Sequence, residues 1–139
     1  MTTRRKRAIV IGPYRGDTVT NIAVAGRCAV WLWNNGYSTF CPHLNTMNFD
    51  VVVDCDDSHY IEFNCDLINT GIFDVCVVLP NWRASEGTTT ELDHIANYIN
   101  DGNDIEFYLW DDTTSCLQRA ELTIKTDLRP CQENAPTTG

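Results

Sequence analysis

Short, mainly apolar segments alternate along this chain with longer segments of helical periodicity. The apolar segments predict strands at 8–12, 37–40, 73–79 and 105–110. The helical segments are 18–35, 58–70 and 88–101. A glycine, the usual C-terminal cap, directly follows each of these segments. Strands that alternate with helices predict an α/β fold, in which right-handed crossovers join parallel strands.

The length and composition fit a single domain built on this alternation. The chain has 139 residues, of which 43% are hydrophobic and 21% charged, as in soluble globular domains. We expect a three-layer sandwich with a mostly parallel sheet of four or five strands, similar to Rossmann-like or flavodoxin-like folds. The domain is expected to cover residues 1–131, with one more helix or strand after Asp111, and residues 132–139 are expected to form a disordered tail.

The charge balance argues against a polyanionic partner. Ten Lys and Arg residues against 19 Asp and Glu residues give a net charge of −9, which repels nucleic acid polymers. No stretch approaches the roughly 20 apolar residues of a membrane span. We therefore expect no membrane partner and a cytoplasmic protein, in the host cytoplasm if a phage encodes it. The seven cysteines are scattered without a CxxC pair, which predicts reduced thiols and no metal site.

Ligands of open α/β sheets bind where the carboxyl ends of the strands meet the following loops. The first such loop, 12–16 (GPYRG), combines backbone amides before a helix with the guanidinium of Arg15, which suits a phosphate or a carboxylate. A glycine turn that carries a solvated arginine explains the same residues. The loop matches neither the dinucleotide fingerprint nor the Walker motif, so we expect no cofactor.

The loop after the third predicted strand leads into a helix that carries Glu91. In the first turn of that helix, Glu91 would face the same crevice as Arg15, where a carboxylate can act as a nucleophile. Ser85 and the amide of Gly87 would then be free donors for a phosphate or a sugar hydroxyl. The same stretch fits a capping box, in which Thr88 begins the helix and Glu91 binds a backbone amide. The sequence leaves both interpretations open.

Three further residues have a functional and a structural interpretation. Asp66 on the preceding helix is a second carboxylate that can approach Glu91 and handle a proton, or a solvated helix residue. His43 in the loop at 41–57 can line a pocket or pack for its own hydrogen bonds. Trp82 can stack on a planar base or cover the edge of the sheet.

Four motifs together resemble the nucleoside 2-deoxyribosyltransferase-like superfamily. They are GPYRG after the first strand, PHL after the second, NCDL before the third and LPNWRASEGTTTEL after it. The similarity runs from about residue 9 to 109, and the superfamily includes the 2′-deoxynucleoside 5′-monophosphate N-glycosidases and small phage and bacterial proteins. The resemblance implies that Glu91 attacks the anomeric carbon of a nucleotide, while Asp66 helps to protonate the departing base.

The resemblance also implies a phosphate site. The positions that hold the 5′-phosphate in the nucleotide-hydrolysing branch are matched by Gly12, Arg15, Gly16, Ser85 and Gly87. Ser85 stands where the nucleoside-exchanging branch carries an aspartate, which would repel a phosphate. We therefore expect hydrolysis of a nucleoside 5′-monophosphate, with base exchange as the alternative and with His43 and Tyr14 completing the substrate site.

Two departures from the family keep other functions open. Ile9 stands where the family has a tyrosine that orients the nucleophile, and Tyr14 can substitute for it from the loop. The aspartate-rich segment 49–58 has no counterpart. A protein that binds or sequesters a nucleotide without cleaving it is one alternative. An interaction protein on an eroded scaffold is another.

The helix at 18–35 predicts a homodimer. Val19, Ile22, Ala23 and Val30 are expected to face the sheet, so that Val24, Trp31 and Trp33 leave apolar surface on other faces of the helix. A second copy of the chain would bury that surface. The alternative is that the C-terminal segment covers the tryptophans.

Overall fold

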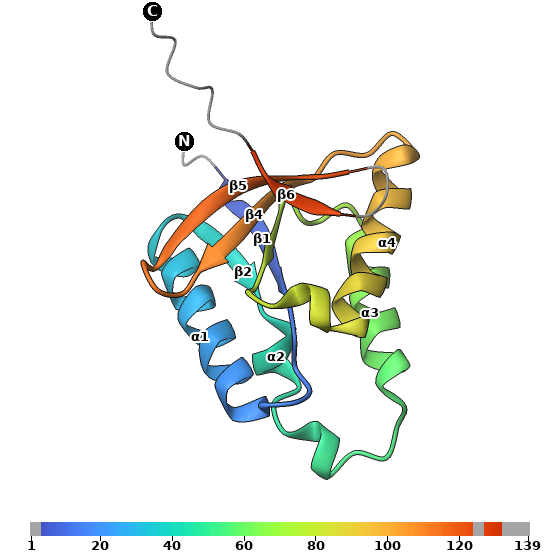
Figure 1. Cartoon of the computed structure of the whole chain (residues 1–139). Helices are drawn as coiled ribbons and strands as arrows, with labels where there is room; N and C mark the ends of the chain where they lie inside the picture. The colour runs from blue at the N-terminus through green and yellow to red at the C-terminus, as the bar shows by residue number, and fades with distance from the viewer. Residues whose placement is uncertain (1–3, 124–126, 132–139) are drawn as a thin grey trace, which may run out of the picture.

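The computed structural model of the chain describes residues 4–123 and 127–131. It contains a six-stranded sheet in the order β2-β1-β3-β4-β5-β6, with helices packed on both of its faces (Figure 1). The α/β class expected from the alternation is therefore confirmed. Among the described residues, no helix combines the length and the apolar character that crossing a bilayer requires. The predicted tail at 132–139 lies outside the described residues.

The first four strands form the parallel part of the sheet. They are β1 (Lys6–Ile11), β2 (Tyr37–Phe40), β3 (Val75–Val78) and β4 (Glu106–Asp111). β1 pairs in parallel with both β2 and β3, and β3 pairs in parallel with β4. The helices are α1 (Thr18–Asn34), α2 (Pro42–Asn45), α3 (Asp57–Asn69) and α4 (Glu86–Asn100). Two short 3₁₀ turns, η1 (Phe49–Val51) and η2 (Trp82–Ala84), lie in the loops.

The expectation of a mostly parallel sheet with four or five strands is wrong, because two antiparallel strands extend it. β5 (Cys116–Leu122) pairs with β4, and β6 (Leu128–Pro130) pairs with β5. At the end of β4, Oδ1 of Asp111 accepts hydrogen bonds from the amides of Thr113 and Thr114 at 2.9 and 3.3 Å. This side-chain turn reverses the chain within a few residues, so β5 returns beside β4 and no crossover helix is needed.

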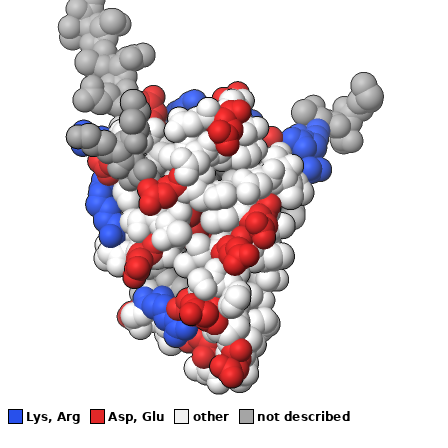
Figure 2. All heavy atoms as spheres, turned by 90° about the vertical axis from the view of Figure 1, so that its right-hand side faces the viewer, with Lys and Arg blue, Asp and Glu red and all other residues white. Residues whose placement is uncertain are grey.

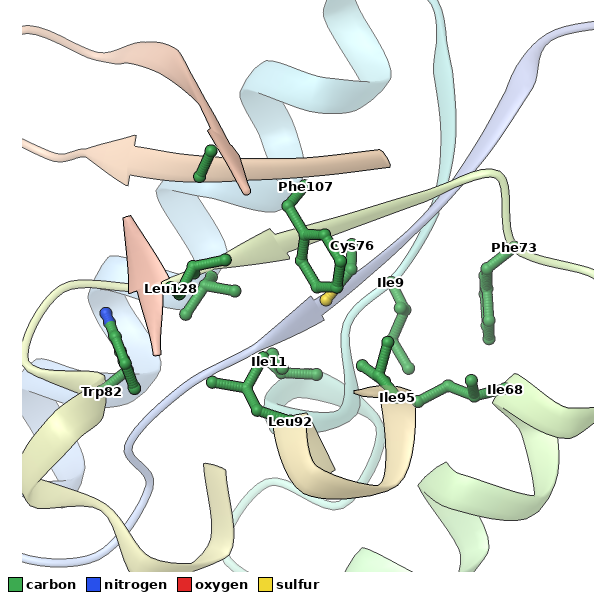
Figure 3. Packing of buried hydrophobic residues seen from close by; sticks show 12 residues of the cluster. Ile9, Ile11, Ile68, Phe73, Cys76, Trp82, Leu92, Ile95, Phe107 and Leu128 are labelled. Atoms are coloured by element: carbon green, nitrogen blue, oxygen red, sulfur yellow. The ribbon is translucent and has the colours of Figure 1, made fainter. Parts of the chain in front are cut away.

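Apolar side chains fill the space on both faces of the sheet. On one face, Ile68 of α3 and Leu92 and Ile95 of α4 pack against Ile9 and Cys76 of the central strands (Figure 3). On the other face, α1 covers β1 and β3. Burial on both sides explains why the two central strands are continuous runs of apolar residues.

Helix α1 turns a different face to the sheet from the predicted one. Its buried residues are Ala25, Cys28, Ala29 and Leu32. Val19 and Val30, predicted to face the sheet, are 81% and 60% exposed. Small side chains at the contact let the helix approach the sheet closely. A prediction that chooses the buried face from the most hydrophobic residues therefore selects the wrong side of this helix. Trp31 packs on Trp110 of β4 with 5.8 Å between the rings, while Trp33 stays half exposed.

The carboxyl ends of β1 and β3 approach each other closely at Gly12. A side-chain carbon on Gly12 would collide with the side chain of Leu79, which directly follows β3. Glycine is therefore required here by packing, whatever else the loop binds.

Candidate functional site

A cavity of about 1020 Å³ opens at the carboxyl ends of β1 and β3. Its wall is formed by the loop after β1, the segment from α2 to the start of α3, and the facing sides of α3 and α4. Seven of the nine predicted site residues line it: Gly12, Tyr14, Arg15, His43, Ser85, Gly87 and Glu91. The other two, Gly16 and Asp66, are not part of its wall. The cavity lies where ligands of open α/β sheets bind.

Glu91 is the one buried carboxyl group among the described residues, with 5% of its surface exposed. Its Oε2 accepts a hydrogen bond of 3.0 Å from Nδ2 of Asn64 on α3. Burial raises the pKa of Glu91 from its ordinary 4.5 to about 7, and the hydrogen bond from Asn64 opposes this rise. A carboxyl group with this pKa is divided between its acid and its nucleophilic form near neutral pH.

Helix α4 begins earlier than predicted, and this changes the surroundings of Glu91. Ser85 caps the helix, because its Oγ accepts hydrogen bonds from the amide and the hydroxyl of Thr88 at 3.2 and 2.9 Å. The capping box of Thr88 and Glu91 is therefore wrong, and Glu91 lies in the second turn rather than the first. The amides of Glu86 and Gly87 have no hydrogen-bond partner among the described residues. They are the free donors that a helix N-terminus offers to an anion.

Arg15 is held by two carboxylates at the mouth of the cavity. Its Nε and Nη2 donate to the two oxygens of Asp57 at 2.8 and 2.6 Å, and its Nη1 lies 3.4 Å from Oδ2 of Asp50. The guanidinium keeps the pKa of Asp57 below its ordinary value. The Arg15 side chain is 57% exposed, so water screens these ion pairs and an anion can compete for the guanidinium. From the sequence, Arg15 was expected either to bind a phosphate or to be solvated. Neither expectation included the ion pairs with Asp57 and Asp50.

His43 and Tyr14 form another part of the wall. Their rings meet edge to face with centroids 5.7 Å apart. Nε2 of the buried His43 lies 2.8 Å from the carbonyl oxygen of Pro13, to which it donates. Burial lowers the pKa of His43, so the imidazole is neutral at pH 7 and adds no positive charge to the cavity.

No tyrosine bonds to Glu91 within the part of the chain that the structure describes. Ile9, at the family's tyrosine position, is fully buried among apolar side chains. The hydroxyl of Tyr14 donates to Oδ1 of Asp50 and accepts from the amide of Asn48, both at 2.9 Å. In this conformation Tyr14 therefore holds η1 against the loop after β1 and does not substitute for the missing tyrosine.

Three predicted residues lie away from the cavity. Asp66 is exposed on α3. Gly16 is exposed, with a left-handed φ of 95°, and its carbonyl accepts from the amide of Thr18 as part of the turn before α1. Trp82 is buried in the core with the guanidinium of Arg83 4.5 Å above its ring. Of its two interpretations, Trp82 fits the one that covers the sheet.

Sequence reasoning missed Asn64, Asp50 and Asp57. Asn64 precedes Asp66 by two positions in the same motif, and two helical positions differ by roughly 200° in direction. The side chain that faces α4 is therefore the asparagine, while the aspartate faces water. Asp50 and Asp57 belong to the aspartate-rich segment for which the family offers no counterpart. The negative charge of this segment was the only feature of the sequence that could have indicated a role. In the structure, Asp50 and Asp57 form ion pairs with Arg15 in the loop after β1.

Acidic side chains dominate the surroundings of the cavity. Six carboxyl groups line it, against a single guanidinium from Arg15, and they are Asp50, Asp56, Asp57, Glu62, Glu86 and Glu91. Figure 2, which views the side of α3 and α4, shows acidic side chains spread over that face with few basic ones between them. An entering anion therefore meets a negative field, and its affinity must come from close donors. No three potential metal ligands are grouped within residues 4–123 and 127–131.

Comparisons with known proteins leave the motifs as the basis of the family resemblance. No protein-family model matches the chain, and no curated protein is similar enough to be matched. What the resemblance implies about substrate and reaction is therefore a proposal, to be weighed against the geometry of the cavity.

Proposed function

We propose that the protein hydrolyses the N-glycosidic bond of a nucleoside 5′-monophosphate and that Glu91 is the nucleophile. The observation that carries the proposal is the position of Glu91, whose buried carboxyl group lines the cavity with Oε2 held by Asn64. A carboxylate fixed in this way can reach a sugar carbon in the cavity while staying largely shielded from water.

The chemistry takes two steps. In the first, an oxygen of ionised Glu91 bonds to C1′ of the sugar while the bond from C1′ to the base breaks, and the base nitrogen keeps the electron pair. Water in the open cavity supplies the proton that neutralises the base. In the second, water attacks C1′, the bond to Glu91 breaks, and the proton lost by the water returns to solvent. Asp66 has no part in this scheme, because it lies outside the cavity wall.

The start of α4 is the proposed site of the 5′-phosphate. The unpaired amides of Glu86 and Gly87 and the hydroxyl of Ser85 can donate to phosphate oxygens there. Ser85 precedes Glu91 by six residues, about 9 Å along the helix axis, which leaves room for a sugar ring between phosphate and nucleophile. Arg15 joins this site when its guanidinium exchanges Asp57 for the phosphate.

A second candidate is base exchange on an uncharged nucleoside. The ion pairs of Arg15 with Asp57 and Asp50 favour it, because they occupy the guanidinium that a phosphate would need. In this reaction a second base, instead of water, attacks C1′ and releases Glu91. The two candidates share the first step and differ in the substrate and in the acceptor.

Self-association through α1 is a further part of the proposal. Val19, Val30 and Trp33 are exposed along one side of this helix. Of the three long helices within the described part of the chain, α1 alone contains no Asp or Glu. The exposed side of α1 also carries Arg27, paired with Asp112, and Arg5 lies over the ring of Trp33. In a chain of net charge −9, two copies repel each other least where both present this helix. We expect a homodimer.

The test is release of free base, followed by chromatography. The protein is incubated with a panel of deoxyribo- and ribonucleoside 5′-monophosphates and the matching nucleosides, with and without a second base. Hydrolysis of a monophosphate supports the first candidate, and exchange on a nucleoside supports the second. Glu91→Ala is expected to abolish both, whereas Asp93→Asn, which alters an exposed carboxylate on the same helix, is expected to retain them. Full activity in Glu91→Ala would refute the nucleophile.

A further inference from the structure

We propose that Asn64 is the residue that positions Glu91 for attack on the sugar, in the place of a tyrosine on the first strand. This inference rests on the function proposed above. It concerns a residue on α3, which lies across the cavity wall from the helix that carries the nucleophile.

The hydrogen-bond geometry singles out Asn64. Its Nδ2 lies 3.0 Å from Oε2 of Glu91, and both side chains line the same cavity. This is the one hydrogen bond that the carboxyl group of Glu91 makes to a described residue. Ile9, beneath the site, has no polar atom in its side chain to offer, and the Tyr14 hydroxyl is engaged by Asp50 and by the amide of Asn48.

A single donor on one carboxylate oxygen has two physical effects. It fixes the rotation of the carboxyl group, because α3 and α4 pack side by side and carry the two partners. It also stabilises the ionised form, since an amide N–H binds a carboxylate more strongly than a neutral acid. Oε1 is then left for the ligand. An orienting tyrosine hydroxyl would supply the same two effects.

The other titratable groups near Glu91 do not compete for this role. The thiols of Cys65 on α3 and Cys76 on β3 lie in its surroundings, and burial raises the pKa of both, so they stay protonated near pH 7. His94, one turn further along α4, lines the cavity, and its Nε2 lies 2.8 Å from Oδ1 of Asn69. Within the described residues, Asn64 is therefore the group whose loss changes the ionisation of Glu91 most directly.

Asn69 supplies a matched control. Like Asn64, it is an asparagine on α3 with a side-chain hydrogen bond to α4, but its partner is His94 instead of Glu91. Asn64→Ala and Asn69→Ala each remove one bond between the two helices. The bond of Asn69 is exposed and that of Asn64 is partly buried, so Asn69→Ala controls for the loss of a side-chain bond between the helices. A positioning role predicts an effect on the titration of Glu91 for Asn64→Ala alone. Asn64→Gln keeps an amide donor and tests for partial rescue.

The experiment combines an NMR titration of ¹³C-labelled glutamate carboxyl groups with the pH profile of base release. In Asn64→Ala, the Glu91 titration and the acidic limb of kcat/KM are both expected to move to higher pH by about one unit, the size of one hydrogen bond to a charged group. The plateau of kcat is expected to fall roughly tenfold, as for a misplaced reacting group. Asn69→Ala should match wild type, and Asn64→Gln should recover part of the loss.

The outcomes separate this inference from the function on which it rests. An unchanged Glu91 titration in a folded Asn64→Ala protein would overturn the role of Asn64, even if base release persists. If the Glu91 titration shifts in Asn64→Ala but no protein, wild type included, releases base, the effect of Asn64 on Glu91 stands and the proposed glycosidase activity is refuted. Thermal melting shows which variants are folded. If Asn64→Ala is not folded, Asn64→Gln decides. Its longer side chain keeps the amide donor but displaces it, so a smaller shift of the Glu91 titration to higher pH is still expected, and an unchanged titration would overturn the role of Asn64.

Discussion

Replacing Glu91 by glutamine is expected to change the pH dependence of stability by an amount that follows from its burial. The pKa of this carboxyl group is about 7 in the folded protein and 4.5 for an ordinary glutamate. Between these values the unfolded chain has lost the proton and the folded protein has kept it. Since the unfolded state then binds fewer protons, the free energy of unfolding falls as the pH rises.

The magnitude is set by the interval between the two pKa values. The stability that the protonated carboxyl group confers is fully present below pH 4.5, decreases by 1.36 kcal/mol per pH unit, and is lost above about pH 7. From pH 5.5 to 8.5, wild type therefore loses about 2 kcal/mol through Glu91. Glutamine has a similar shape and cannot ionise, so Glu91→Gln is expected to gain about 2 kcal/mol relative to wild type over this range.

Urea unfolding followed by tryptophan fluorescence measures this difference at four pH values from 5.5 to 8.5. Asp93→Asn is the control, because it removes an exposed carboxylate from the same helix. Parallel stability curves for Glu91→Gln and wild type would show that Glu91 ionises freely in the folded protein. The burial argument, and with it the choice of Glu91 as a nucleophile poised near neutral pH, would then fail.

Two further predictions concern packing and assembly. Gly12→Ala is expected to lower the free energy of unfolding by about 1–3 kcal/mol, the range for overpacking, because its new methyl group meets Leu79. Gly87→Ala, which faces only the flexible end of a side chain, should stay near wild type in the same urea titration, and equal losses would contradict the packing role of Gly12. If the proposed dimer forms through α1, Val30→Asp is expected to convert it to a monomer in light scattering at micromolar concentration. A wild-type monomer under those conditions would remove the proposed interface on α1.

The parallel half of the fold was predictable because its signals are local. Runs of β-branched residues mark β1 and β3, capped helices separate the four strands, and their parallel direction follows from the alternation of strands with helices. The hairpin of β5 and β6 was not predictable in the same way. β5 reads CLQRAEL, with only a weak alternation of apolar and polar residues, and its pairing depends on the side-chain turn at Asp111.

The sequence predicted which loops form the candidate site, but not which side chains contact each other within it. Topology alone places the loop after β1 beside the start of α4, so Arg15, Ser85 and Glu91 share one cavity. The partners of these residues depend on side-chain directions that spacing does not reveal. Asn64 faces Glu91 and Asp66 does not, although both belong to one motif. Likewise, the hydroxyl that caps α4 belongs to Ser85, which was expected to be a free donor, and not to Thr88.

The antiparallel hairpin also protects the sheet from unwanted pairing with other chains. Without β5, the apolar strand β4 would end the sheet and present a row of free amides and carbonyls, which is a template for strand-to-strand aggregation. The strand that does end the sheet, β6, is three residues long and finishes with Pro130, whose nitrogen has no hydrogen to donate. This end of the sheet therefore offers little template for pairing with another chain.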